Sequence, residues 1–257
     1  MDNFDKVIAE AHNIVDEALP PTLNTTSAAP DALRDADTVA GRIDHTLLKA
    51  EATAEAVIAL CLEAREHGFA SVCVNSRWVP LASAQLAGSS VMVCTVVGFP
   101  LGATTRRAKA EEARVAISEG AAEVDMVIDI GGMLSNKLIE VYEDIAGVVE
   151  AAKPAPVKVI LETHLLTPLQ IAVACILASR AGAAYVKTST GFGGGGATVS
   201  DIALLRAVVG KDLGVKASGG VRTVQDANAL LKAGADRIGA SASVAIVTGA
   251  AAGTGAY

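Results

Sequence analysis

Three lysines interrupt segments that otherwise have the composition of buried β-strands. They are Lys158 in VKVILET, Lys187 in AYVKTST and Lys216 in GVKASGG. Lysine is almost never fully buried unless another group pairs with it or uses it. A single buried Lys–Glu pair would be ordinary structural ion pairing. Three such lysines are harder to explain in this way, because each buried ion is costly unless geometry and hydrogen bonds offset its desolvation. We therefore predict a functional cluster of amines.

Acidic residues accompany these lysines. In EVDMVID, alternation puts Glu123, Asp125 and Asp129 on one face of a strand together with Val127, and puts Val124, Met126 and Ile128 on the other. The apolar face can pack against helices, so the acidic face is expected to point into the interior of the fold or its mouth. By the same rule, Glu162 shares a face with Lys158.

A lysine acts as a nucleophile only when its amine is neutral, and at its ordinary pKa of about 10.4 it is almost wholly protonated near neutral pH. A second ammonium about 4 Å away, at an effective dielectric of about 20, repels it by about 4 kcal/mol. Since one pKa unit corresponds to about 1.36 kcal/mol, this repulsion lowers the pKa by roughly three units. Lys187 and Lys216 lie on consecutive predicted strands and could form such a pair. An amine activated in this way attacks carbonyl groups and forms a Schiff base.

Glycine-rich segments follow the last three strand candidates. They are TGFGGGGAT (190–198), SGGVRT (218–223) and IGASAS (238–243), the last of which opens a short helix. Backbone N–H groups freed at glycines, together with a helix N-terminus, form anion sites. A single GG pair more often marks a tight turn. Two such segments after consecutive strands favour a phosphate site, which barrels usually build from the loops after strands 7 and 8.

The elements that carry these residues alternate regularly. Strand candidates cover residues 42–48, 71–75, 91–99, 123–129, 157–163, 184–190, 214–220 and 236–241. Helical periodicity between them covers residues 53–67, 104–119, 137–152, 167–181, 198–209 and 223–233. Eight strand–helix units predict an α/β fold, a (β/α)8 TIM barrel with its active site at the C-terminal ends of the strands. The alternative is an open doubly wound sheet, but the GxGxxG typical of that fold does not follow the first strand.

Three parts are expected along the chain. Residues 1–41 form an N-terminal helical extension and linker that pack on the barrel, with helices over 3–18 and 30–40. Residues 42–250 form the barrel itself, and residues 251–257 form a flexible C-terminal tail.

Composition narrows the class of protein. The net charge is −7 and no basic cluster exists beyond Arg106 and Arg107, which argues against nucleic acid or an anionic membrane as a partner. The acidic, amphipathic N-terminus lacks the apolar segment of a signal peptide, and no apolar stretch is long enough to span a bilayer, so a cytoplasmic protein is expected. The four cysteines form no CxxC and have no His pair nearby. We therefore expect free buried thiols, with neither a disulfide framework nor a zinc site.

Taken together, these segments resemble the deoxyribose-phosphate aldolase family, class I Schiff-base enzymes on a (β/α)8 barrel. The resemblance runs from residue 43 to residue 243 and is carried by IDHTLLK, TVVGFPLGA, EVDMVIDIG, KVILET, YVKTSTGFGGGGAT, GVKASGGVRT and DRIGASAS. It implies reversible cleavage of 2-deoxy-D-ribose 5-phosphate to D-glyceraldehyde 3-phosphate and acetaldehyde, in deoxyribonucleoside catabolism. It implies phosphosugar and aldehyde substrates and no metal or other cofactor, and the apolar helix faces are compatible with a homodimer.

Site residues follow from the same resemblance, motif by motif. Lys187 resembles the Schiff-base lysine, Lys216 the neighbour that lowers its pKa and assists proton transfer, and Asp125 the acid/base that moves protons with a water. Substrate-binding positions are implied at Asp44, Thr46, Lys158, Thr188, Gly191, Gly219, Gly220, Gly239 and Ser241. Among them, the positions from Gly219 onward match the family's phosphate-binding loops.

Two features lie outside the family's common pattern. His164 follows KVILET where the family more often has a small residue, and it either lies harmlessly at a loop edge or alters access to the site. Tyr257 either reaches the substrate as a proton carrier or belongs to a disordered end. Two other functions stay open. One is another phosphosugar aldolase or isomerase, and the other is a non-catalytic sugar-phosphate sensor, which would need the glycine loops but not the paired lysines.

Overall fold

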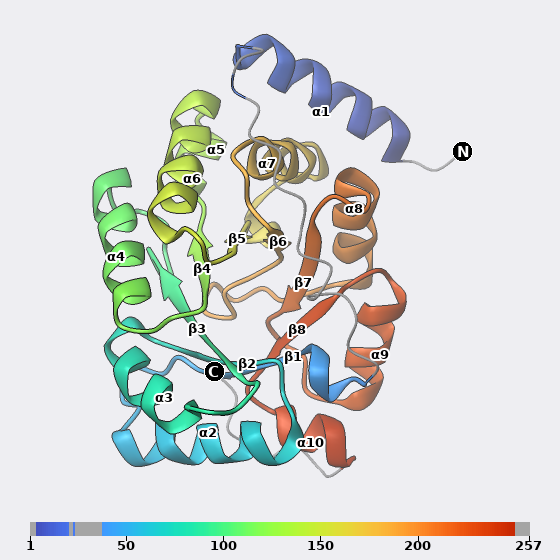
Figure 1. Cartoon of the computed structure of the whole chain (residues 1–257). Helices are drawn as coiled ribbons and strands as arrows, with labels where there is room; N and C mark the ends of the chain where they lie inside the picture. Colours follow the sequence, from blue (N-terminus) through green and yellow to red (C-terminus); the bar gives the residue numbers. More distant parts are fainter. Residues whose placement is uncertain (1–3, 21–22, 24–37, 250–257) are drawn as a thin grey trace.

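The chain folds into a closed barrel of eight parallel strands with helices around it (Figure 1). The computed structural model describes residues 4–20, 23 and 38–249. Most of the expected linker and of the helix over 30–40, together with the tail that ends in Tyr257, lies outside the described residues.

The strands occur where the sequence pattern places them. They are β1 (Ile43–Leu47), β2 (Ser71–Val74), β3 (Met92–Val97), β4 (Glu123–Val127), β5 (Val157–Ile160), β6 (Tyr185–Lys187), β7 (Gly214–Ser218) and β8 (Arg237–Ala240). Each strand pairs in parallel with its neighbours along the chain, and β1 pairs with β8 to close the barrel. The predicted (β/α)8 architecture is confirmed.

The helices form the outer layer (Figure 1). They are α1 (Phe4–Ala18), α2 (Ala54–His67), α3 (Val79–Leu86), α4 (Arg106–Ser118), α5 (Ile130–Leu134), α6 (Leu138–Ala152), α7 (Pro168–Arg180), α8 (Val199–Val209), α9 (Val224–Lys232) and α10 (Ser243–Thr248). Threonine side chains fix several starts: Thr53, Thr167 and Thr223 each accept a hydrogen bond from the backbone three residues on. All the predicted helices within the described residues are present, whereas α3 and α5 were not predicted.

Alternation along the strands separates an apolar outer layer from a charged interior. On β4, Val124 and Met126 are fully buried and belong to the large apolar core between strands and helices. Glu123 and Asp125 are equally buried but pair with cations carried by other strands. The acidic face predicted for this strand therefore points into the barrel.

The strands end earlier than predicted, and two acidic residues are affected. β5 ends at Ile160, and Glu162 has a left-handed backbone (φ 56°), so it does not continue the strand face of Lys158. Asp129 lies beyond the end of β4 and caps α5 by accepting a 2.9 Å hydrogen bond from the backbone of Gly132, so strand alternation does not set the direction of its side chain. Period-two alternation applies only while the chain stays extended.

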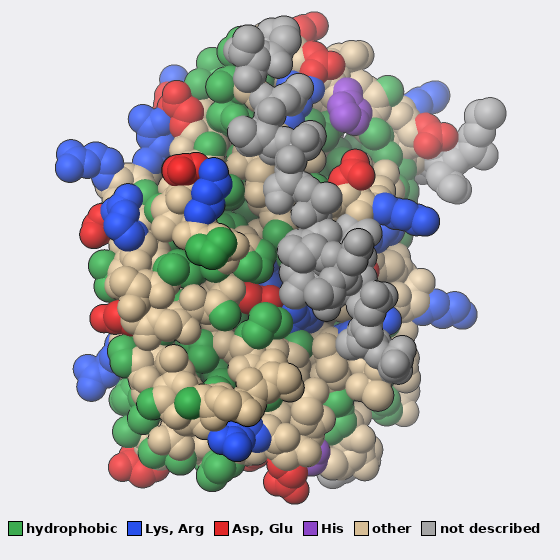
Figure 2. Space-filling view, in the orientation of Figure 1, with side chains coloured by type: hydrophobic (Ala, Val, Ile, Leu, Met, Phe, Trp, Pro, Cys, Tyr) green, Lys and Arg blue, Asp and Glu red, His purple; other side chains and the backbone are tan. Residues whose placement is uncertain are grey.

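The N-terminal helix α1, predicted over 3–18, lies outside the ring of barrel helices and packs on α7 (Figure 1). Ala11 and Val15 are buried in this contact, and Asp16 pairs with Arg180 of α7. Acidic and basic side chains are interspersed over the face seen in Figure 2. None of the described helices is both long and apolar enough to cross a membrane.

Candidate active site

Three buried lysines converge on one carboxylate inside the barrel. The Nζ atoms of Lys187 and Lys216 each lie 2.7 Å from Oδ2 of Asp125, and Nζ of Lys158 lies 2.9 Å from its Oδ1. Three of these four residues have no exposed surface, and Lys187 is 4% exposed. The structure therefore brings together the three residues predicted to be catalytic, with Lys158 beside them.

Strand register explains this convergence. Asp125 on β4 is the register partner of Lys158 on β5, and Lys187 on β6 is the partner of Lys216 on β7. Side chains at paired positions of neighbouring parallel strands point to the same face of the sheet. Lys187 is also the last residue of β6. Its amine therefore lies near the C-terminal edge of the barrel, where barrel enzymes have their active sites.

Two further carboxylates and a guanidinium extend the cluster. Asp44 lies 2.5 Å from Nζ of Lys216 and 2.6 Å from Nη1 of Arg237. Glu123 lies 2.7 Å from Nζ of Lys158 and 2.9 Å from Nη2 of Arg237. The structure thus places Asp44 within the ionic cluster. The sequence analysis missed Arg237, although a charged residue inside the apolar strand DRIGAS is the same signal that the lysines gave.

Cations outnumber carboxylates in this cluster of described residues. The cationic side chains are Lys158, Lys187, Lys216 and Arg237, and the carboxylates are Asp44, Glu123 and Asp125. Because one cation is in excess, the cluster becomes electrically neutral when one of the four gives up its proton. Among the residues that the structure describes, Lys187 has a single ion-pair partner, whereas Lys158 and Lys216 each have more than one.

Opposite charges outweigh burial in setting the protonation of the cluster. Burial raises the pKa of Asp125, but the three surrounding ammonium groups hold that pKa well below its ordinary value. Burial lowers the pKa of Lys216, but the charges of Asp125 and Asp44 raise it above its ordinary value. Lys216 therefore stays protonated at neutral pH. Lys187 and Lys216 are thus not an isolated pair of amines, because they share Asp125 as a counter-ion.

The first residue after β6, Thr188, is hydrogen-bonded to the last residue of β7, Ser218. Oγ1 of Thr188 donates to the carbonyl of Ser218 at 3.0 Å and accepts from its N–H at 3.1 Å. Gly219 and Gly220 follow with φ of 88° and 77°, and Gly191 has φ of 85°. A left-handed backbone of this kind favours glycine, so these positions are glycines because the loops turn there.

Three other predicted positions lie around β1 and β8. Gly239 lies within β8, not in the following loop, and a Cβ there would come 3.1 Å from Cε of Lys216. Glycine therefore leaves room for the lysine side chain. Thr46 donates to the carbonyl of Asp44 at 2.8 Å, and Thr46 and Ser241 line the same cleft beside β1.

Comparison with known proteins places this architecture in a family. Residues 38–257 match the family model of the DeoC/LacD family aldolases. The chain belongs to this family. The deoxyribose-phosphate aldolase of Brevibacillus brevis is 60% identical over 208 residues, which are 81% of this chain and 94% of the relative. The deoxyribose-phosphate aldolase of Streptococcus gordonii is 58% identical over 207 residues, covering 80% and 94%.

Solved structures agree with the assignment to the DeoC/LacD aldolases. A chain from Coccidioides immitis superposes with a TM-score of 0.82 at 40% identity, over 97% of this chain and 98% of its own. The tetrameric deoxyribose phosphate aldolase of Aeropyrum pernix superposes with a TM-score of 0.77 at 33% identity, over 95% and 97%.

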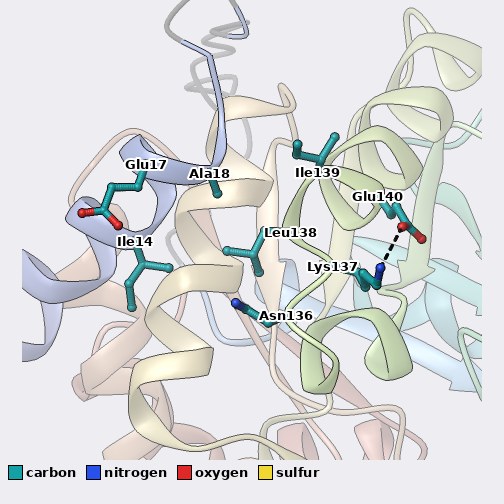
Figure 3. Close-up of a pocket in the computed structure, with 8 residues that line it drawn as sticks. All are labelled: Ile14, Glu17, Ala18, Asn136, Lys137, Leu138, Ile139 and Glu140. Carbon is teal, nitrogen blue, oxygen red and sulfur yellow. Dashed lines mark ion pairs between the residues drawn. The ribbon is translucent and has the colours of Figure 1, made fainter.

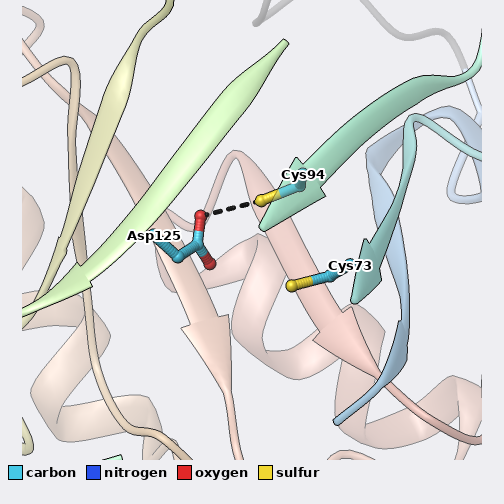
Figure 4. A group of neighbouring side chains, drawn as sticks. All are labelled: Cys73, Cys94 and Asp125. Carbon is cyan, nitrogen blue, oxygen red and sulfur yellow. Dashed lines mark hydrogen bonds between the residues drawn. The ribbon is translucent and has the colours of Figure 1, made fainter. Parts of the chain in front are cut away.

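Two thiols of this family member face the same carboxylate (Figure 4). Cys73 on β2 and Cys94 on β3 are register partners, and both are buried and free, as predicted. Cys94 Sγ lies 3.2 Å from Asp125 Oδ1 and 3.4 Å from Nζ of Lys158. The trio could supply ligands to a metal ion. However, both oxygens of Asp125 already accept hydrogen bonds from ammonium groups, whose charge opposes a cation at this place.

An open groove of about 510 Å³ lies away from the lysine cluster (Figure 3). It runs between the end of α1, with Ile14 and Glu17, and the start of α6, with Leu138 and Ile139. It contains none of the residues predicted for catalysis or for substrate binding.

Proposed function

We propose that this chain acts as a deoxyribose-phosphate aldolase, which cleaves 2-deoxy-D-ribose 5-phosphate reversibly to D-glyceraldehyde 3-phosphate and acetaldehyde. The observation that carries the proposal is the pair of buried amines, Lys187 and Lys216, that donate to one oxygen of Asp125. Bacterial relatives that bear this name are 57–60% identical to the chain, which supports the substrate. A non-catalytic sensor would have no need to bury an unmatched amine.

Lys187 is the proposed nucleophile. It has one carboxylate partner within the described part of the chain, it retains some exposed surface, and it ends its strand at the edge where substrates enter. An amine adds to a carbonyl only in its neutral form. The neutral amine then adds to the substrate carbonyl, one proton taken up from solvent lets the former carbonyl oxygen leave as water, and an iminium ion forms that can accept electrons from the bond that breaks.

Asp125 and Lys216 are the proposed proton-transfer pair. When the C–C bond breaks, its electrons convert the iminium into a neutral enamine, and the substrate hydroxyl loses its proton. The cluster loses one positive charge in that step, so the influence that holds the pKa of Asp125 low becomes weaker. Asp125 then accepts the proton through a water and later returns it to the enamine carbon. Such general acid–base steps contribute about 10²–10⁴-fold.

The phosphate is proposed to bind at the loops after β7 and β8. The turn at Gly219 and Gly220 and the segment from Ser241 into α10 lie next to each other, because Ser218 of β7 is the register partner of Gly239 of β8. Thr188 and Gly191 belong to the adjacent loop after β6. Binding the far end of the substrate there would hold its carbonyl carbon close to Lys187.

Reductive trapping tests the proposal directly. Borohydride added with acetaldehyde should reduce the Schiff base and add a two-carbon label to the peptide that contains Lys187, which peptide mass analysis reads. Lys187→Ala should abolish the label. Lys153→Ala, at an exposed helix end, should leave it unchanged. A label on another lysine, or none in the unaltered protein, contradicts the proposal.

A substrate panel separates the rival activities. Turnover of 2-deoxy-D-ribose 5-phosphate supports the proposed aldolase, whereas turnover of ketose phosphates alone supports another phosphosugar enzyme. Binding of phosphosugars by a protein that forms no Schiff base would support a sensor.

Self-association is also proposed, as a homodimer. Leu62 on α2 and Val115 on α4 are exposed apolar side chains on the outer layer, and the relative from Aeropyrum pernix is tetrameric. Light scattering of the purified protein gives the mass that tests it.

A further inference from the structure

His164 lies against the glycine-rich loop that follows β6. It belongs to the short 3-10 helix η4 (Thr163–Leu165), and its Nδ1 lies 3.2 Å from Oε1 of Glu162. A Cβ on Gly193 would come 2.9 Å from Cε1 of His164, and a Cβ on Gly195 would come 2.6 Å from Cβ of His164. Neither glycine has a left-handed φ. Side chains are therefore excluded by neighbouring groups and not by the backbone conformation: by His164 at Gly195, and by His164 with the Glu162 carboxylate, 3.2 Å away, at Gly193.

The group that holds His164 is itself fixed to the same loop. Glu162 is 2% exposed, and its Oε2 accepts hydrogen bonds from Oγ1 of Thr190 at 2.5 Å and from the Thr190 backbone at 3.3 Å. Thr190 Oγ1 in turn accepts from the backbone of Phe192 at 3.0 Å. Glu162 thus ties the end of β5 to the first residues of the loop that begins just after Lys187.

The other end of this loop lies on the turn after β7. The Ala197 backbone donates to the carbonyl of Gly219 at 3.0 Å, and a Cβ on Gly196 would come 2.6 Å from that carbonyl oxygen. The loop over residues 191–196 is therefore confined between His164 on one side and Gly219 on the other. If His164 moves, the closely packed loop must change its conformation or displace the turn at Gly219.

We propose that His164 is a positioning residue that sets the place of the 191–196 loop against the Gly219 turn, and thereby the affinity for the phosphate of the substrate. This inference rests on the proposed function, because it assumes that the turn binds phosphate. Substitutions at the contact between His164 and the 191–196 loop raise KM for phosphorylated substrate and leave Schiff-base formation at Lys187 unchanged.

A double-variant cycle tests the contact. Gly193→Ala and His164→Ala should each raise KM for 2-deoxy-D-ribose 5-phosphate several-fold. The double variant should be no worse than the worse single variant, because the added methyl group then occupies space that the ring has left. Two independent effects would instead multiply, and that result would overturn the proposal.

Gly195→Ala supplies a matched contrast. A Cβ on Gly195 would meet Cγ and Nδ1 of the His164 ring as well as the Cβ of His164, and the change of His164 to alanine retains only the last of these atoms. The KM of Gly195→Ala should rise at least about tenfold, and His164→Ala should rescue it only in part, because the clash with the Cβ of His164 remains. Gly147→Ala on α6 is the control, because a Cβ there meets nothing within 4 Å. If Gly195→Ala does not fold, the cycle with Gly193→Ala still decides the question.

Two readouts separate failure of this proposal from failure of the proposed function. Borohydride trapping with acetaldehyde, and turnover of unphosphorylated 2-deoxyribose, should be unchanged in every loop variant. Equal losses with phosphorylated and unphosphorylated substrate would overturn the role of His164 while leaving the aldolase intact. Absence of trapping in the unaltered protein would instead overturn the proposed function.

Discussion

Lysine is buried in two different settings in this barrel. Lys109 on α4 is completely buried, and its Nζ lies 2.5 Å from Oδ2 of Asp144 on α6 and 2.9 Å from the carbonyl of Val127. Here one cation meets one carboxylate. Inside the barrel, Lys187 belongs to a cluster in which cations exceed carboxylates by one.

The difference shows that burial of a charge does not by itself indicate catalysis. The Lys109–Asp144 pair is matched, so both groups can remain charged, and the pair joins α4, α6 and the end of β4. The cluster around Lys187 is unmatched, so loss of a proton from one amine relieves repulsion. An unmatched cation, and not a buried one, is the feature that points to chemistry.

The largest effect is expected from Lys187→Ala. Removal of the nucleophile should lower turnover of 2-deoxy-D-ribose 5-phosphate on the order of 10⁴-fold or more. The free energy of unfolding should fall little, because the variant removes the excess positive charge. Steady-state assays and urea unfolding measure the two quantities. A variant that loses most of its stability as well would remove the distinction between the two lysine sites.

Lys109→Met should have the opposite profile. It leaves the buried Asp144 without its cation, so the free energy of unfolding should drop by about 3–5 kcal/mol. The folded fraction should still form the Schiff base at Lys187. Urea unfolding, together with trapping normalised to folded protein, checks this expectation, and loss of trapping in the folded fraction would contradict it.

The dependence of stability on pH should differ in sign between Asp125 and Asp144. The pKa of Asp125 is depressed, so its ionised form stabilises the fold above about pH 4 and this stability is lost as the pH falls. Burial raises the pKa of Asp144 despite Lys109, so Asp144 weakens the fold as the pH rises above about 4. Asp125→Asn should therefore reduce acid sensitivity and Asp144→Asn should increase it. Urea unfolding across pH 3–7 measures how the free energy of unfolding of each variant changes with pH relative to the unaltered protein. Relative changes of the same sign in the two variants would contradict this expectation.

The smallest effect is expected when both members of the matched pair are replaced. Lys109→Met combined with Asp144→Leu substitutes apolar groups for a buried ion pair, which is often neutral or stabilising. The double variant should therefore lie within about 1 kcal/mol of the unaltered protein. If it is as unstable as Lys109→Met alone, the pair has a structural role beyond charge matching.

The sequence predicted local features well, because they depend on neighbouring residues. Alternation within EVDMVID correctly turned Asp125 inward, and the order of strands and helices specified the barrel. Prediction failed where the chain leaves regular structure. Asp129 became a helix cap and Glu162 adopted a left-handed backbone, and the period-two pattern contains no information on either change.

The sequence alone determined which residue types face the interior of the barrel and which loops are rich in glycine. Only the tertiary structure decided how the charges pair. Closure of the barrel brings Arg237 of β8 to Asp44 and Glu123, and makes Asp125 a counter-ion for both Lys187 and Lys216. These partners are separated by dozens of residues or more, and electrostatic energy depends on their distance in space, which strand periodicity does not specify.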